Sequence, residues 1–165
     1  MKQHKQVGLD YIEDPSKYRE MSYRFDKPAS MVWAALLDPK AWTEWLPLTD
    51  VIWTDPQGTT VGSQRTVKAG KNTIEETFLA WEPGRRLAFR FERTDLPVSA
   101  FAEDYIVESL GENQSKLTWR IRGDAFFLIK PLIYGQLAKG GKEGFPKLAA
   151  LLENEPERFG AAPAA

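Results

Sequence analysis

The side chains of this chain that are suited to acid–base chemistry are those of Arg65, Glu76, Glu103 and Tyr105. An arginine or a tyrosine polarises a carbonyl group by donating a hydrogen bond, and a carboxylate moves a proton. Such a set is chemically sufficient for an aldol-type cyclisation or a dehydration. Nothing in the sequence requires such a reaction, so we assign no catalytic residue from the sequence.

Several common catalytic groups are missing from the sequence. The only histidine is His4, in a polar N-terminal stretch, and there is no cysteine. Histidine-dependent triads and thiolate metal sites are therefore not expected in the domain. The neighbours Glu75 and Glu76 point to opposite faces of a strand, as do Glu103 and Asp104, so neither pair converges on one cation. We expect no metal and no cofactor, and a binding protein rather than an enzyme.

These side chains lie in a region whose hydrophobic pattern has a period of two. Leu87, Phe89 and Phe91 are apolar on one face of a strand, and Ala88 and Arg90 lie on the other. Turn-forming sequences separate the successive segments, which predicts an antiparallel meander. The predicted strands are 19–25, 51–54, 63–69, 73–81, 86–93, 100–110 and 115–122.

Two short helices are predicted between the first strand and the second. Pro28 suits a first helical turn, and Asp38 followed by Pro39 both ends that helix and caps the next. A helical pattern returns from residue 124, but it contains several glycines. It fits two helices joined near residues 139–143, or one kinked helix in which Gly141 and Gly144 leave space against the sheet.

The order of these elements is that of a known fold. The segments that carry the likeness are PASMVWAALLDPKAWTEWLP, VGSQRTV, AWEPGRRLAFRFE and SKLTWRIRG. The run from Ser22 to Leu152 resembles the SRPBCC (START/Bet v 1-like) superfamily and is most similar to its bacterial polyketide cyclase/dehydrase and lipid-transport branch. The resemblance implies an α+β helix-grip fold, with a curved antiparallel sheet of about six to seven strands wrapped round a long C-terminal helix. It also implies a ligand cavity, but it carries over no catalytic motif.

The implied cavity would be lined by inward strand positions and by the last helix. In the register that the resemblance implies, Arg65 faces inward, where an unpaired guanidinium is costly. A partner such as Glu76 or Glu103 would make it an ordinary cross-strand ion pair at the sheet rim, and the aromatic candidates would equally serve as core. The predicted ligand-binding residues are Trp42, Trp45, Arg65, Phe89, Phe91, Phe101, Tyr105, Trp119, Tyr134, Leu137 and Gly141.

Length and charge limit the class of protein. The chain has 165 residues, with 22 basic and 23 acidic residues and a formal net charge of −1. This suits a single domain and disfavours a nucleic-acid partner. No stretch reaches the roughly 18 apolar residues of a membrane span, and the lack of cysteine suits the cytoplasm. We expect an arm at residues 1–18, one domain at 19–155 and a flexible tail at 156–165.

Three functions follow from this sequence. The leading hypothesis is the binding or carrying of a small, mostly apolar, lipid- or polyketide-like molecule with one polar end. The alternative is a metal-free cyclase or dehydratase, with Arg65 and Tyr105 as electrophilic groups and Glu76 or Glu103 as the base. The third is a protein-interaction role, which an exposed apolar patch around Trp42 and Trp45 would favour.

Overall fold

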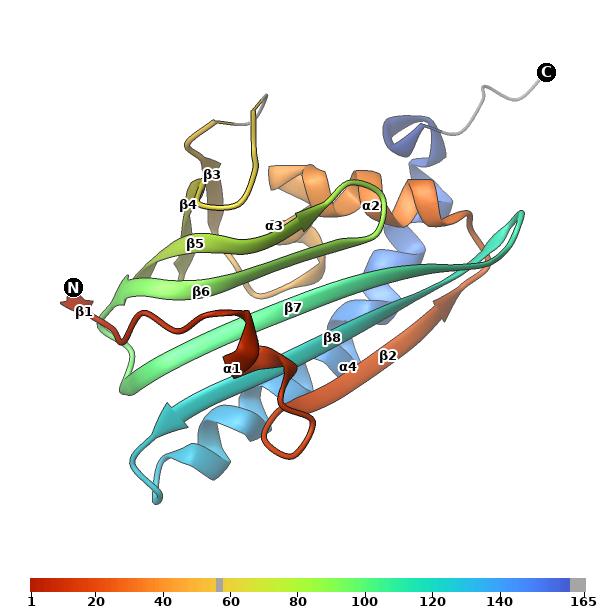
Figure 1. The fold of residues 1–165 in the computed structure, drawn as a ribbon. Helices are drawn as coiled ribbons and strands as arrows, with labels where there is room; N and C mark the ends of the chain where they lie inside the picture. Colours follow the sequence, from red (N-terminus) through yellow and green to blue (C-terminus); the bar gives the residue numbers. More distant parts are fainter. Residues whose placement is uncertain (56–57, 161–165) are drawn as a thin grey trace.

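The computed structural model describes residues 1–55 and 58–160. An eight-stranded antiparallel sheet forms most of the molecule, in the order β2-β8-β7-β6-β5-β4-β3, with the short β1 paired to β6 (Figure 1). All the predicted strands are present, and β1 was not predicted. The strands are β1 (Lys2–Gln3), β2 (Arg19–Phe25), β3 (Asp50–Trp53), β4 (Gln64–Ala69), β5 (Asn72–Glu82), β6 (Arg86–Thr94), β7 (Val98–Gly111) and β8 (Gln114–Ala125).

Helices cover both faces of the sheet. The long C-terminal helix lies against one face, and α1 lies on the other, in front of β7 and β8 in Figure 1. The two predicted short helices follow β2 and contact the C-terminal helix at one end of it. The helix-grip fold expected from the sequence is therefore confirmed. The helices are α1 (Leu9–Glu13), α2 (Ala29–Leu37), α3 (Pro39–Trp45), α4 (Lys130–Asn154) and the 3-10 turn η1 (Pro156–Phe159).

The C-terminal helix α4 is continuous, so the interpretation as two helices is wrong. The expected space beside its glycines is also absent. A Cβ atom on Gly141 would lie 2.7 Å from the sulfur of Met21, and one on Gly144 would lie 2.7 Å from the backbone oxygen of Trp45. The two glycines thus let α4 approach β2 and α3 closely, and this packing offsets their low helix propensity.

The N-terminal arm is packed on the sheet. Val7 and Ile12 are buried against Ala100 and Ala102 of β7, on the face opposite α4. His4 is also buried, and its Nε2 lies 3.2 Å from the backbone oxygen of Thr94. The polar arm laid on the surface is therefore held by a small apolar cluster of its own.

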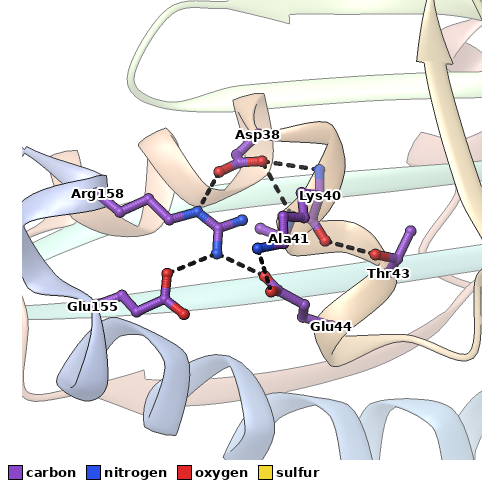
Figure 2. Close-up of polar contacts among 7 residues, drawn as sticks. All are labelled: Asp38, Lys40, Ala41, Thr43, Glu44, Glu155 and Arg158. Atoms are coloured by element: carbon purple, nitrogen blue, oxygen red, sulfur yellow. Dashed lines mark hydrogen bonds and ion pairs between the residues drawn. The ribbon is translucent and has the colours of Figure 1, made fainter.

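An ion-pair cluster ties the C-terminal turn to the short helices, as Figure 2 shows. Asp38 caps α3 by accepting hydrogen bonds from the backbone amides of Lys40 and Ala41, and it also pairs with Arg158 at 2.7 Å. Arg158 further bonds Glu44, at 2.8 Å. Within the tail expected from the sequence, Pro156–Phe159 form the 3-10 turn η1, and Phe159 is buried. Residues 161–165 of that predicted tail lie outside the described residues.

Candidate ligand-binding site

A cavity of about 420 Å³ lies between the sheet and α4. This volume is in the range of pockets that take small organic molecules. Its walls come from the inward-facing positions of β4 to β8, the first half of α4, and the loops around Pro47 and Pro97. The cavity is mostly apolar, and its ionisable side chains form two sets on the sheet, with Arg65 and Glu76 on the paired strands β4 and β5 and Glu103 and Tyr105 on β7.

Most of the predicted site residues do line this cavity, although their role in ligand binding stays a prediction. Alternation along the strands explains the agreement, since every second residue of a strand faces the same side. Trp42 is positioned from α3 by a hydrogen bond from its Nε1 to the backbone oxygen of Leu36 at 2.8 Å. The predicted residues in the wall are Trp42, Arg65, Phe89, Phe91, Phe101, Tyr105, Trp119 and Leu137.

Three predicted site residues are not in the wall. Trp45 is core, with its ring stacked 5.9 Å from that of Phe145 on α4. The hydroxyl of Tyr134 accepts a hydrogen bond from the backbone amide of Gly123 at 2.9 Å, which holds this side chain at the end of β8. Gly141 contacts the sheet too closely to border a void, and Gly140 lines the cavity instead.

Arg65 and Glu76 form a cross-strand ion pair inside the cavity rather than at the sheet rim. They are directly paired residues of β4 and β5, and Arg65 Nε lies 2.5 Å from Glu76 Oε2. Arg65 is 2% exposed, and its guanidinium carbon lies 4.4 Å from the ring centres of both Trp42 and Phe89. Its Nη1 is buried and has no hydrogen-bond partner among the residues that the structure describes. A buried donor of this kind is costly unless another molecule satisfies it.

Glu103 holds the second polar group of the cavity. Its Oε2 accepts hydrogen bonds from the hydroxyl of Tyr105 at 2.7 Å and from Nε1 of Trp119 at 2.8 Å. Burial, together with the nearby charge of Glu76, raises the pKa of Glu103 to about 7. Burial also raises the pKa of Glu76, against the effect of Arg65, and raises that of Tyr105 well above its ordinary value. Glu103 therefore exchanges a proton near neutral pH.

Other parts of the wall were not predicted. Val67 and Ile74 continue the inward faces of Arg65 and Glu76 by two residues, so strand alternation could have identified them. The loop residues had no such signal, because only the fold brings them to the cavity. Glu76 and Glu103, expected as the partner of Arg65 or as the base of the alternative function, also line the wall. The unpredicted wall residues are Val67, Ala69, Ile74, Leu46, Pro47, Leu48, Leu96, Pro97, Val98, Ile129, Leu132, Ile133, Gln136 and Gly140.

Within residues 1–55 and 58–160, no group of three or more histidine, cysteine, aspartate or glutamate side chains is arranged to hold a metal ion. Among the same residues, no helix has the length and apolar character needed to cross a membrane.

Solved structures share the fold. An aromatase/cyclase from Streptomyces sp. R1128 superposes with a TM-score of 0.68 at 14% sequence identity, over 88% of this chain and 99% of that one. A START superfamily protein from Mycobacterium smegmatis gives a TM-score of 0.68 at 9% identity, over 84% of this chain and 98% of that one. At such identities the likeness concerns the fold alone.

Sequence comparison is more specific. The uncharacterized protein Rv2574 of Mycobacterium tuberculosis is 33% identical over 137 residues, which cover 77% of this chain and 81% of the relative. The uncharacterized protein Mb2604 of Mycobacterium bovis matches to the same extent. The family model described as "Polyketide cyclase / dehydrase and lipid transport" matches residues 20–153. The chain therefore belongs to the polyketide cyclase/dehydrase and lipid-transport family.

Proposed function

We propose that this protein binds a small, mostly apolar molecule with one polar end inside the cavity beneath α4. The observation that carries the proposal is the composition of the wall. Aromatic and aliphatic side chains form most of it, and its ionisable side chains are confined to the sheet, with Arg65 and Glu76 on β4 and β5 and Glu103 and Tyr105 on β7. Apolar walls supply affinity, and a few grouped polar atoms orient a ligand.

The charges of the polar group indicate the chemistry of the ligand's polar end. Glu76 neutralises Arg65 through Nε, while the buried Nη1 of Arg65 still has a proton to donate. An uncharged acceptor, such as a carbonyl or hydroxyl oxygen, satisfies this donor without adding a charge to the interior. Glu103 lines the same cavity, and because its pKa is about 7 it can offer the ligand a donor when protonated or an acceptor when ionised.

Filling the cavity from α4 tests the proposal. Gly140 lines the cavity, and a Cβ atom there meets nothing within 4 Å, so Gly140→Leu places a side chain in the void. A neutral naphthylamine fluorophore should bind the wild-type protein with a gain in fluorescence, and about tenfold more weakly to Gly140→Leu, because the leucine occupies ligand volume.

The matched control is Gly135→Leu. Gly135 also lies in α4 with open space around its Cβ position, but it is not in the cavity wall. Both variants gain the same helix propensity. Equal probe affinity in the two variants, or no probe binding to the wild type, would overturn the proposal. Native mass spectrometry of gently purified protein gives a second readout, as a ligand mass that Gly140→Leu loses.

A second candidate function is cyclisation or dehydration, and one specific observation favours it. Arg65, Tyr105, Glu76 and Glu103 all line one cavity, which is the arrangement this chemistry requires. The carboxylate of Glu103 would take a proton from a carbon next to a carbonyl, while Arg65 Nη1 donates to the carbonyl oxygen. The resulting enolate carbon would bond to a second carbonyl carbon of the same molecule as that carbonyl π bond breaks, and the new alkoxide would take up the proton held by Glu103. Removal of a second proton from the same carbon, with departure of the hydroxyl group, would release water.

Glu103→Gln separates the two functions. Both hydrogen bonds to Glu103 end on one oxygen, which the amide oxygen of glutamine replaces. The variant should bind the neutral fluorophore as the wild type does. Conversion of a soluble poly-β-ketone analogue, followed by ultraviolet absorbance, should disappear in the variant. If the wild-type protein leaves the analogue unchanged, the enzyme function is rejected and the binding function is not affected.

The protein-interaction role has lost the feature that was expected to favour it. Trp42 and Trp45 are each 1% exposed, so neither contributes to an exposed apolar patch. The two rings pack against each other and against Tyr105. They belong to the interior that shapes the cavity.

A further inference from the structure

The connection from β8 to α4 exposes large apolar side chains that the core does not use. Phe126, Phe127, Leu128 and Leu132 are 61%, 70%, 68% and 64% exposed, and we call these four residues the apolar tip. The rings of Phe126 and Phe127 lie 4.7 Å apart and pack on each other. Three consecutive exposed side chains of this size are unusual, because a soluble domain normally buries them.

Basic residues accompany the apolar tip. Residues 125–142 contain Lys130, Lys139 and Lys142 and lie between Asp124 and Glu143, of which Glu143 forms an exposed ion pair with Lys139 at 3.9 Å. Lys139 lies seven residues after Leu132 and so shares its face of α4. Apolar side chains flanked by lysines are the pattern that binds an anionic lipid surface. A second copy of this chain fits less well, since pairing two tips would bring like charges together.

The apolar tip is continuous with the cavity. Leu132 is largely exposed and also lines the cavity, and Ile129 and Ile133 beside it belong to the same wall. The wall thus reaches the protein surface at the tip. A molecule that leaves a bilayer at this point would meet apolar side chains along the whole path, with no step through water.

We propose that the apolar tip docks onto an anionic lipid bilayer, and that docking places the opening of the cavity at Leu132 against the membrane. The inference rests on the proposed function, because it describes how an apolar ligand enters the same cavity. Docking buries the two phenylalanine rings in the headgroup and acyl boundary, while Lys130 at the start of α4 and Lys139 on the face of Leu132 contribute attraction to the anionic headgroups.

Vesicle flotation tests the proposal. The full chain should float with vesicles of equal parts phosphatidylcholine and phosphatidylglycerol, more weakly with phosphatidylcholine alone, and less as salt is added. Phe126→Ser combined with Phe127→Ser should weaken binding to anionic vesicles by about tenfold or more. Lys130→Gln should weaken it about fivefold, and only on anionic vesicles.

Leu110→Ser is the matched control. Leu110 is 43% exposed in the β7–β8 hairpin, at the other end of β8 from the apolar tip, so its loss should leave flotation unchanged (Figure 1). Thermal unfolding of each variant checks that the fold is retained. This control separates the tip from exposed apolar surface in general.

Three results would overturn the proposal: no flotation of the wild type, equal flotation of the double serine variant, or a dimer in light scattering that the double variant abolishes. The naphthylamine probe, measured without vesicles, reads the proposed function separately. If the probe binds but the protein does not float, only the docking proposal is rejected. Flotation without probe binding rejects the ligand-binding function, and with it the route of ligand entry.

Discussion

Arg65 bonds Glu76 across the β4–β5 ladder through a single guanidinium nitrogen, Nε, at 2.5 Å, and both side chains are buried. The rings of Trp42 and Phe89 lie against the guanidinium. The pair therefore lies in an apolar environment, where each charge depends on the other and where Nη1 has no hydrogen-bond partner among the described residues.

Breaking this pair on one side should be strongly destabilising. Glu76→Leu leaves the Arg65 charge buried and unpaired, so the free energy of unfolding should fall by about 3–5 kcal/mol. Arg65→Met together with Glu76→Leu should lose less than that single variant, because no charge remains inside. Urea unfolding of the wild type, both single variants and the double variant measures the coupling between the two residues.

The neighbouring surface pair is the control for this cycle. Lys68 on the same strand bonds Asp50 at 3.3 Å with both side chains well exposed. Lys68→Ala should change the free energy of unfolding by less than about 1 kcal/mol. If the coupling energy between Arg65 and Glu76 is also below about 1 kcal/mol, the two buried charges do not depend on each other as we infer.

Glu103 should make the wild type less stable as pH rises toward neutrality. Its pKa is about 7 in the folded protein, against an ordinary value of 4.5, so the native state binds more protons than the unfolded state between these values. The free energy of unfolding therefore falls as pH rises through this window, by roughly 3 kcal/mol at most.

Glu103→Gln removes this titration while its amide oxygen can still accept both hydrogen bonds. The variant should gain stability relative to the wild type as pH rises from 4.5 to about 7, with a constant difference above that. Unfolding by urea across this range provides the measurement. A difference that does not change with pH would show that folding does not raise the pKa of Glu103.

Glycines of α4 should respond in opposite directions to the same substitution. A Cβ at Gly144 would lie 2.7 Å from the backbone oxygen of Trp45, whereas at Gly135 it meets nothing within 4 Å. Gly144→Ala should therefore destabilise the protein by about 1–3 kcal/mol through overpacking. Gly135→Ala should stabilise it by up to about 1 kcal/mol. Thermal unfolding compares the two, and stabilisation by both would contradict the close contact of α4 with α3.

Arg158 should stabilise the C-terminal turn. It bonds Asp38, Glu44 and Glu155, and Arg158→Ala should lower the free energy of unfolding by about 1–2 kcal/mol. Burial raises the pKa of Asp38, but bonds from Arg158 and backbone amides outweigh it and hold that pKa below 3.8. The stabilisation is thus present above pH 3.8 and is lost as pH falls through the lowered folded pKa.

The control for Arg158 is an exposed pair of similar spacing. Arg85 bonds Glu82 at 3.0 Å, with 69% of the arginine side chain exposed. Arg85→Ala should have an effect below about 0.5 kcal/mol. Equal effects of the two substitutions in urea unfolding at neutral pH would mean that the cluster of Figure 2 does not anchor η1.

Local patterns in the sequence were enough for the elements of the fold. The alternation of Leu87, Phe89 and Phe91 predicts a strand with one buried face, and β6 has that face toward the core. Asp38 and Pro39 predict the end of one helix and the cap of the next, and the structure shows both. These signals depend on residues a few positions apart, which is why they can be read directly from the chain.

The sequence by itself also determined which residue types were available to a site, including the single arginine between Ser63 and Val67 and the absence of cysteine. Only the tertiary structure decided that Arg65 pairs with Glu76, that Glu103 instead holds Tyr105 and Trp119, and that Gly140 rather than Gly141 borders the cavity. These choices depend on strand register and on the seating of α4 against the sheet. Both arise from contacts between residues far apart in the chain, which no local pattern contains.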